Sequence, residues 1–268
     1  MPWLDRSDSG YAPRGAVAPG DWMRLHAGLA LLALMCVLLT PLMVALGLLM
    51  RGKRRGRFAR STITWVFERH LRAMERIGAM RLDLGELDAL RDAPAMIIAP
   101  NHPSMVDAAL ALSRLPNLTC IMKSDILDNV LFGSGARMAG YITSEPPRQM
   151  LRAATESLKA GRHLLLFPEG TRTGVLPVNR FQRTVGVIAR RAGVPVQTVI
   201  IETGSAFLAK GWGPLRVPAM PMHYRVRLGR RFEAPADADA FSAELENYFR
   251  DELARARLPD IPVTDASS

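Results

Sequence analysis

A histidine and an aspartate five positions apart, His102 and Asp107, directly follow a short apolar run. Pro103 suits the first turn of a helix, so His102 is expected at a strand-to-helix corner with Asp107 a little over one helical turn later. Across such a corner the carboxylate can hold one imidazole nitrogen, while the other nitrogen accepts a proton from a substrate hydroxyl. The pair therefore predicts general-base chemistry in which the substrate hydroxyl itself attacks.

Other interpretations of this segment need weighing, because a histidine outside any wider pattern is more often structural. A metal site would need a third or fourth ligand at useful spacing, and the sequence offers none, so no metal is expected. Ser104 could act as a nucleophile, but it lacks the Gly-x-Ser-x-Gly turn that exposes such a serine. Asn101 and Ser104, which flank His102, are placed instead among the predicted substrate-binding residues.

A second polar segment follows the apolar run Leu164–Phe167 and reads Pro-Glu-Gly-Thr-Arg-Thr. Gly170 would let the backbone approach a ligand closely, and Thr171 with nearby backbone N–H groups could donate to phosphate oxygens. Arg172 could grip a phosphate with its fork of N–H donors. Glu169 could position a hydroxyl or hold Arg172. By itself such a turn is more often structural.

Together and in this order, the two segments resemble the glycerolipid acyltransferase family, which includes the 1-acylglycerol-3-phosphate acyltransferases. The family motif Asn-His-x4-Asp is matched by residues 101–107, and Phe-Pro-Glu-Gly-Thr-Arg by residues 167–172. The run Val194-Pro195-Val196 resembles a later apolar motif that contains a proline. The resemblance covers roughly residues 60–230.

The resemblance implies a role for each matching position. His102 would be the general base and Asp107 its partner, while Arg172 would bind the acceptor phosphate. Pro195 would shape the acyl or acceptor pocket, and Lys123 is a further candidate cation at the end of a predicted strand. The predicted substrate-binding set is Asn101, Ser104, Lys123, Glu169, Gly170, Thr171, Arg172 and Pro195.

The implied reaction moves a fatty acyl group from acyl-CoA or acyl-acyl carrier protein to 1-acylglycerol-3-phosphate, giving phosphatidate without a metal or redox cofactor. The net charge of +10 would attract an acidic carrier protein or an anionic membrane surface. Aromatic residues make up 6%, which leaves little for stacking bases, so nucleic acid is not an expected partner. Two rival hypotheses are a non-catalytic membrane-tethered lipid- or phosphate-binding protein and a thioester hydrolase. The oligomeric state is not predicted.

The chain departs from the family at the second motif, usually Gly-x-Ile-Phe-Ile-Asp-Arg. Here the stretch from Gly140 onward is Gly-Tyr-Ile-Thr-Ser-Glu-Pro-Pro-Arg, with no arginine at the matching place and with Glu145 beside it. A carboxylate there would repel phosphate, and Arg148 follows two prolines. An acceptor with a different headgroup, as in specialised lipid or polyene pathways, is therefore an alternative.

The elements expected to position these groups alternate between strand and helix. Buried strands are predicted over residues 95–99, 118–122, 163–167 and 196–201, with an alternating strand over 222–228. Helices are predicted over 108–115, 150–160, 184–192 and 237–257. This alternation predicts an α/β fold with a mixed, mostly parallel sheet flanked by helices.

The N-terminal part reads as a membrane anchor. After a tail over residues 1–26, residues 27–50 carry no charge and are long enough to cross a bilayer, or to form a re-entrant hairpin with its tip at Thr40-Pro41. Residues 51–80 read as a basic amphipathic interfacial helix, residues 81–260 as the acyltransferase domain and 261–268 as a disordered tail. The basic run after residue 50 places the catalytic domain on the cytoplasmic face of the inner membrane.

Overall fold

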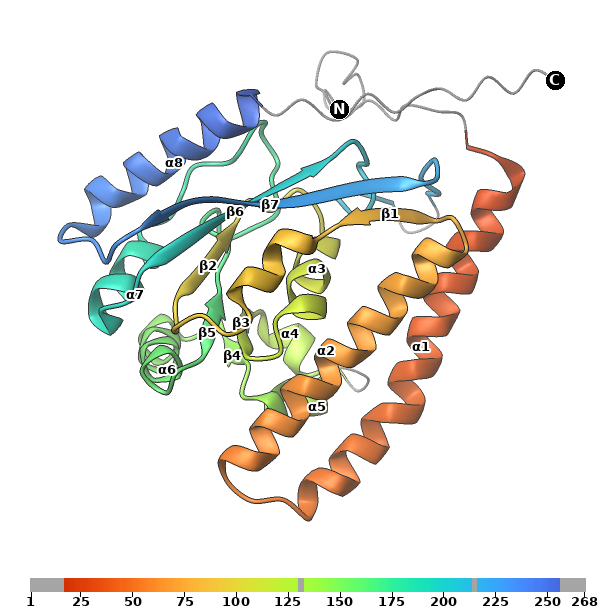
Figure 1. The fold of residues 1–268 in the computed structure, drawn as a ribbon, viewed down its shortest axis with the longest axis horizontal. Helices are drawn as coiled ribbons and strands as arrows, with labels where there is room; N and C mark the ends of the chain where they lie inside the picture. Colours follow the sequence, from red (N-terminus) through yellow and green to blue (C-terminus); the bar gives the residue numbers. More distant parts are fainter. Residues whose placement is uncertain (1–16, 130–132, 214–215, 256–268) are drawn as a thin grey trace.

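The computed structural model describes residues 17–129, 133–213 and 216–255. Its centre is a seven-stranded sheet in the order β1-β7-β6-β2-β5-β3-β4 (Figure 1). Neighbouring strands are parallel except β6 and β7, which are antiparallel, so the predicted mixed, mostly parallel sheet is confirmed. The strands are β1 (Met80–Asp83), β2 (Ile97–Pro100), β3 (Leu118–Met122), β4 (Ile142–Thr143), β5 (His163–Leu165), β6 (Val196–Thr203) and β7 (Met222–Phe232).

Helices cover both faces of the sheet, which is why β2 and β6 are buried at every position. Ile98 faces a core shared with α1, α2, α3 and the short 3₁₀ helix η1, whereas Ile97 and Ala99 face a core shared with α6, α7 and α8. The helices are α1 (Pro19–Leu48), α2 (Lys53–Arg76), η1 (Gly85–Leu90), α3 (Val106–Arg114), α4 (Ser124–Leu127), α5 (Gly133–Ala139), α6 (Pro147–Lys159), α7 (Thr184–Ala192) and α8 (Ala238–Arg255).

The sequence-based boundaries differ from the structure in instructive places. β3 and α7 have the predicted limits, and α7 ends at Gly193, whose φ of +65° suits a left-handed helix cap. α6 begins at Pro147, three residues before the predicted start, because proline is favourable in a first helical turn. β1 and β4 were not predicted, since four and two residues are too few to show a periodic pattern.

The N-terminal region forms two packed antiparallel helices (Figure 1). α1 continues through Pro41, so the alternative of a re-entrant hairpin with its tip at Thr40-Pro41 is wrong. The chain reverses at residues 49–52 instead, where Gly52 has a φ of +59° that favours glycine. α2 then packs along α3 and α5 and ends at Arg76, four residues before the predicted limit. The predicted tail over residues 261–268 lies outside the described residues, whereas the tail predicted over residues 1–26 is wrong for residues 19–26, which belong to α1.

Candidate active site

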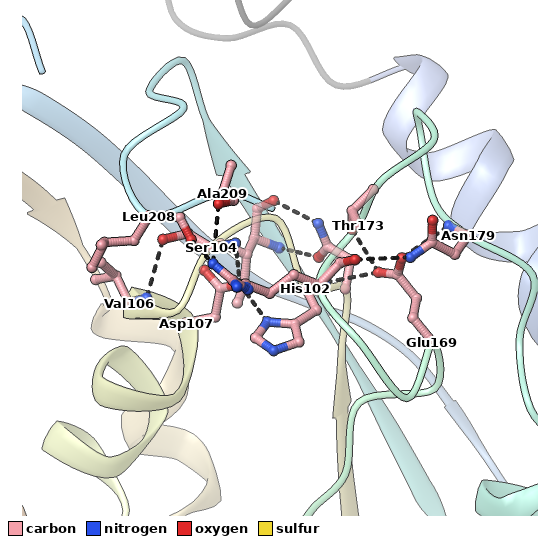
Figure 2. A network of polar contacts seen from close by, with 12 residues as sticks. His102, Ser104, Val106, Asp107, Glu169, Thr173, Asn179, Leu208 and Ala209 are labelled. Atoms are coloured by element: carbon pink, nitrogen blue, oxygen red, sulfur yellow. Dashed lines mark hydrogen bonds and ion pairs between the residues drawn. The ribbon is translucent and has the colours of Figure 1, made fainter. Parts of the chain in front are cut away.

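The predicted pair is formed, at the carboxyl ends of the central parallel strands. The His102 ring nitrogen Nδ1 lies 2.9 Å from Oδ2 of Asp107, and the backbone N–H of Ser104 donates to the same oxygen at 2.8 Å (Figure 2). Asp107 stands in the first turn of α3, while His102 lies in the short loop between β2 and that helix. The strand-to-helix corner therefore lets the carboxylate reach back to the imidazole.

Burial controls the charge state of Asp107. Its side chain is fully buried, and this desolvation raises the pKa of the carboxyl from 3.8 to about 6. The hydrogen bond from His102 and the Ser104 N–H act in the opposite direction, while the nearby Glu169 carboxylate adds a smaller rise in the pKa. Asp107 is consequently ionised at neutral pH, where it accepts hydrogen bonds, and becomes protonated in mild acid.

The far side of the His102 ring is available to a substrate. The ring stacks on Phe167, with the centroids 3.7 Å apart and the planes 15° from parallel, which fixes its orientation. The side chain remains 15% exposed, and no residue in the described part of the chain hydrogen-bonds to Nε2. With Nδ1 held by Asp107, Nε2 is the nitrogen that can accept a proton. The stacking role of Phe167 was not predicted from the sequence.

Ser104 is fully buried and is engaged by its own chain. Its hydroxyl donates to the carbonyl of Phe207 at 2.8 Å and accepts the backbone N–H of Val106 at 3.1 Å, at the start of α3. The hydroxyl is therefore committed to shaping the loop that holds Asp107. The predicted direct contact of Ser104 with substrate has no support in this geometry.

Asn101 is also buried, and its side-chain amide makes the two hydrogen bonds to β6 that the backbone of a further strand residue would make. Its Nδ2 donates to the carbonyl of Ile201 at 2.9 Å, and its Oδ1 accepts the N–H of the same residue at 2.7 Å. These bonds extend the β2–β6 pairing beyond Pro100, which has no N–H to donate. Asn101 thus positions the residue that follows it instead of binding a ligand.

Glu169 ties the two predicted motifs together. Its Oε1 accepts the backbone N–H of His102 at 2.9 Å and the hydroxyl of Thr173 at 2.8 Å, and its Oε2 accepts the N–H of Asn179 at 2.8 Å (Figure 2). The N–H of Thr173 in turn donates to the carbonyl of His102 at 2.7 Å. Glu169 therefore fixes the backbone of the catalytic segment, and it contacts neither Arg172 nor an open position for a hydroxyl.

Replacing Glu169 by glutamine tests this role. The side chain is 2% exposed and accepts three hydrogen bonds, so the amide NH₂ would face a donor with no acceptor available. We expect the Glu169→Gln variant to lose about 1–3 kcal/mol of unfolding free energy, measured by denaturant titration. Stability equal to that of the wild-type protein would contradict this account of the network.

The remaining residues of the second motif differ in their surroundings. Gly170 has a φ of +67°, and a Cβ on it would lie 2.3 Å from the side chain of Gln182, so glycine is required there. Thr171 is exposed and has no side-chain hydrogen bond to the described residues. Nη1 of Arg172 donates to the backbone carbonyls of Leu208 and Ala209 at 2.9 and 3.0 Å.

Two predicted substrate-binding residues lie away from His102. Lys123 is exposed just beyond β3, two strands from β2, although it shares the carboxyl edge of the sheet. Pro195 precedes β6, and its carbonyl accepts the N–H of Ile97, at the opposite end of the strands from His102. That separation is on the order of 15 Å along the strands, so the predicted place of Pro195 at the pocket is a misassignment. The motif spacing could not reveal which strand end the proline occupies.

The substituted second motif lies at the far edge of the sheet. Glu145 and Arg148 are both exposed, with Glu145 just after β4 and Arg148 in the first turn of α6. In the part of the chain that the structure describes, no group of three or more His, Cys, Asp or Glu side chains is arranged to hold a metal ion.

Comparison with known proteins agrees with this arrangement. The Acyltransferase family profile matches residues 81–202, which contain both motifs. A 1-acyl-sn-glycerol-3-phosphate acyltransferase of Pseudomonas aeruginosa is 25% identical over 175 residues, covering 63% of this chain and 66% of that protein. A lyso-ornithine lipid O-acyltransferase of the same organism is 35% identical over 111 residues, covering 40% and 43%. The chain thus spans between 43% and 66% of the length of these relatives.

The fold is also found in a solved structure. The crystal structure of the 1-acyl-sn-glycerophosphate (LPA) acyltransferase PlsC from Thermotoga maritima superposes with a TM-score of 0.69, covering 88% of this chain and 99% of that one at 21% identity. This likeness shows the fold, which in this chain is a mixed, mostly parallel sheet flanked by helices, with a long apolar helix in its N-terminal part. The match over residues 81–202 and these similarities support the glycerolipid acyltransferase family for this chain.

Proposed function

We propose that the protein transfers a fatty acyl group from a thioester donor, acyl-CoA or acyl-acyl carrier protein, to a hydroxyl of a lyso-lipid. The observation that carries the proposal is the 2.9 Å contact between His102 Nδ1 and the buried Asp107 carboxylate, with Nε2 left available. An imidazole held in this way accepts a proton from an attacking hydroxyl, because the carboxylate stabilises the imidazolium that forms. No covalent link to the protein is required.

The chemical steps balance with this one pair. The acceptor oxygen attacks the thioester carbonyl as its proton moves to Nε2 of His102, and a C–O bond forms. The tetrahedral intermediate then expels the sulfur, the C–S bond breaks, and the imidazolium returns the proton to the thiolate. The products are an ester and a free thiol. General-base help contributes about 10²–10⁴-fold to such a reaction, and orientation of the two substrates contributes further.

The proposed acceptor is 1-acylglycerol-3-phosphate, which would give phosphatidate, in keeping with the names of one relative and of the structural neighbour. One observation favours a second acceptor class: no arginine stands at the matching place of the second motif, where Pro146 follows the exposed Glu145. Without that cation, an acceptor phosphate lacks an oppositely charged partner there. A lyso-lipid with an amino headgroup, as the name of the lyso-ornithine lipid acyltransferase relative indicates, is therefore the second candidate.

A product analysis decides among these possibilities. The purified protein is incubated with each thioester donor and with a mixture of phosphorylated, amino and neutral lyso-lipids, and the products are identified by mass spectrometry. Acceptor-dependent diacyl product is the expected result, and its headgroup names the acceptor. Free fatty acid without acyl product would identify a thioester hydrolase. Bound lyso-lipid with intact thioester would identify a binding protein, and either result would overturn the proposal.

We further propose that α1 and the turn after it contact the membrane. α1 is long and apolar enough to span a bilayer, and much of its surface is not covered by the protein. Its exposed apolar side chains include Leu34, Leu38 and Leu42, which are 53–61% exposed. Exposed basic side chains follow at the turn, including Arg51, Lys53 and Arg54. Such an arrangement suits insertion beside anionic headgroups on the cytoplasmic side.

Vesicle binding tests the membrane contact. We expect a Leu34→Gln/Leu38→Gln/Leu42→Gln variant to bind phosphatidylglycerol-containing vesicles at least about tenfold more weakly, because each exposed leucine would otherwise bury apolar surface in the bilayer. Flotation after detergent removal measures the bound fraction. The matched control carries Ala243→Gln and Asn247→Gln, which are exposed positions on α8. Equal flotation of the triple variant and the control would refute the contact.

A further inference from the structure

Arg172 is expected from the motif to face the acceptor, yet one nitrogen of its guanidinium, Nη1, is held by the protein's own backbone. Nη1 donates to the carbonyls of Leu208 and Ala209 at 2.9 and 3.0 Å, and the side chain is partly buried against the loop that follows β6. Backbone carbonyls carry no net charge, so they do not neutralise the arginine, but they do fix where its fork of donors points.

The segment that Arg172 holds, residues 207–209, has an unfavourable backbone. Among the residues that the structure describes, Leu208 is the one non-glycine with a positive φ, at +55°. A left-handed conformation is unfavourable for a residue with a Cβ and persists where surrounding contacts impose it. The carbonyl of Leu208 receives two of those contacts, one from Arg172 and one from the backbone N–H of Met105 at 3.2 Å.

The same segment supports the catalytic pair from the other side. The Ser104 hydroxyl donates to the Phe207 carbonyl at 2.8 Å, and the Ser104 backbone N–H donates to the Asp107 carboxylate at 2.8 Å. A shift of residues 207–209 would thus move Ser104 and weaken the hold on the carboxylate that orients His102. A continuous set of hydrogen bonds runs from Arg172, through the 207–209 segment and Ser104, to Asp107.

We propose that Arg172 is a positioning residue that holds Leu208 in its left-handed conformation and so keeps the 207–209 segment against the His102–Asp107 pair. This role rests on the proposed acyl transfer for its kinetic readout, but its structural readout does not depend on any activity. It differs from the role that the family resemblance implies, in which the arginine binds the acceptor phosphate.

A double-mutant cycle on Arg172 and Leu208 separates the two roles. We expect Arg172→Ala to lower kcat by about ten- to a hundredfold, as a small misplacement of reacting groups does, with the acceptor KM within about twofold of wild type. Glycine adopts the left-handed conformation readily, so Leu208→Gly should recover about threefold or more of the lost kcat in the Arg172→Ala background. The single Leu208→Gly variant completes the cycle. Arg172→Gln, which keeps one donor, should show a weaker form of the same pattern if the alanine variant does not fold.

Hydrogen exchange supplies the readout that needs no substrate. In Arg172→Ala the amide of Met105 and those of residues 207–209 should exchange at least about tenfold faster, whereas Lys210→Ala, which removes a neighbouring exposed cation, should leave them unchanged. Unchanged exchange in Arg172→Ala would overturn the proposal. So would a tenfold rise in acceptor KM with unaltered kcat and no rescue by Leu208→Gly, because that is the signature of a headgroup ligand. If the wild-type protein shows no acyl transfer, the proposed function is refuted. The hydrogen-exchange result alone then decides whether Arg172 is a positioning residue.

Discussion

The His102→Ala variant is expected to transfer acyl groups about a thousandfold more slowly than the wild-type protein, within the 10²–10⁴-fold range of general-base catalysis. Without the imidazole, no group held by Asp107 remains to accept the proton of the acceptor hydroxyl. Initial rates with saturating donor and acceptor measure the effect in kcat. Transfer at the wild-type rate would end the proposed mechanism.

The control for this experiment must show that the fold survives. The His102 ring stacks on Phe167, so its loss removes about 0.5–1.5 kcal/mol of packing, which is too little to unfold a domain of this size. Circular dichroism and thermal melting of His102→Ala should therefore show a folded protein. His223 on β7 lies outside the site and provides the matched variant, since His223→Ala should transfer at the wild-type rate.

The Asp107→Asn variant is expected to lose transfer by a hundredfold or more, in the range of about 10²–10⁴-fold for a disrupted base. An asparagine oxygen in the place of Oδ2 can still accept from both the Ser104 N–H and His102 Nδ1, but it carries no negative charge, and its NH₂ would take the place of Oδ1, which has no hydrogen-bond partner among the described residues. Without that charge, the imidazolium that forms when His102 takes up the proton is no longer stabilised. The same initial-rate assay measures this loss, and a variant within threefold of wild type would show that the carboxylate is dispensable.

The pH dependence follows from the same carboxyl. Burial raises the pKa of Asp107 to about 6, so wild-type kcat/KM should fall as the pH is lowered through about 6, when the protonated carboxyl no longer stabilises an imidazolium. The contribution of Asp107 to this fall should be missing in Asp107→Asn. A wild-type profile that stays flat between pH 5 and 8 would contradict the assignment.

The pH affects folding stability through Asp107 in the opposite direction to activity, because lower pH favours the folded state. Because the folded pKa lies above the usual 3.8, the folded state binds this proton more tightly than the unfolded chain does. The resulting stabilisation is fully present below about pH 4 and is lost as the pH rises through about 6. The melting temperature of Asp107→Asn minus that of the wild-type protein should therefore be greater at pH 7 than at pH 5. Melting curves at the two pH values measure this difference.

The sequence was sufficient for features that depend on near neighbours. The limits of β3 and α7 follow from apolar runs ended by turn residues, and the contact between His102 and Asp107 follows from a short loop between a strand and a helix. The alternation of strands and helices was likewise enough to predict the mixed, mostly parallel sheet.

The features that were missed depend on partners far along the chain. Asn101 and Ser104 looked like ligand contacts because their partners, Ile201 and Phe207, lie about a hundred positions later. The carbonyls that hold Arg172 belong to the backbone, which carries no residue-specific signal. Asn179, which supports the second motif, gave no signal either, because its spacing from Glu169 fits no known pattern.

The two hydrogen bonds between Asn101 and Ile201 also affect when the site can form during synthesis of the chain. Residues 101–107 leave the ribosome about a hundred residues before the strand that anchors them, so the nascent chain carries an imidazole and a carboxylate that nothing yet holds in register. Domains with many distant contacts gain their final geometry late in synthesis. A chain that stalls before β6 emerges would thus contain both reactive side chains and still be inert toward thioesters.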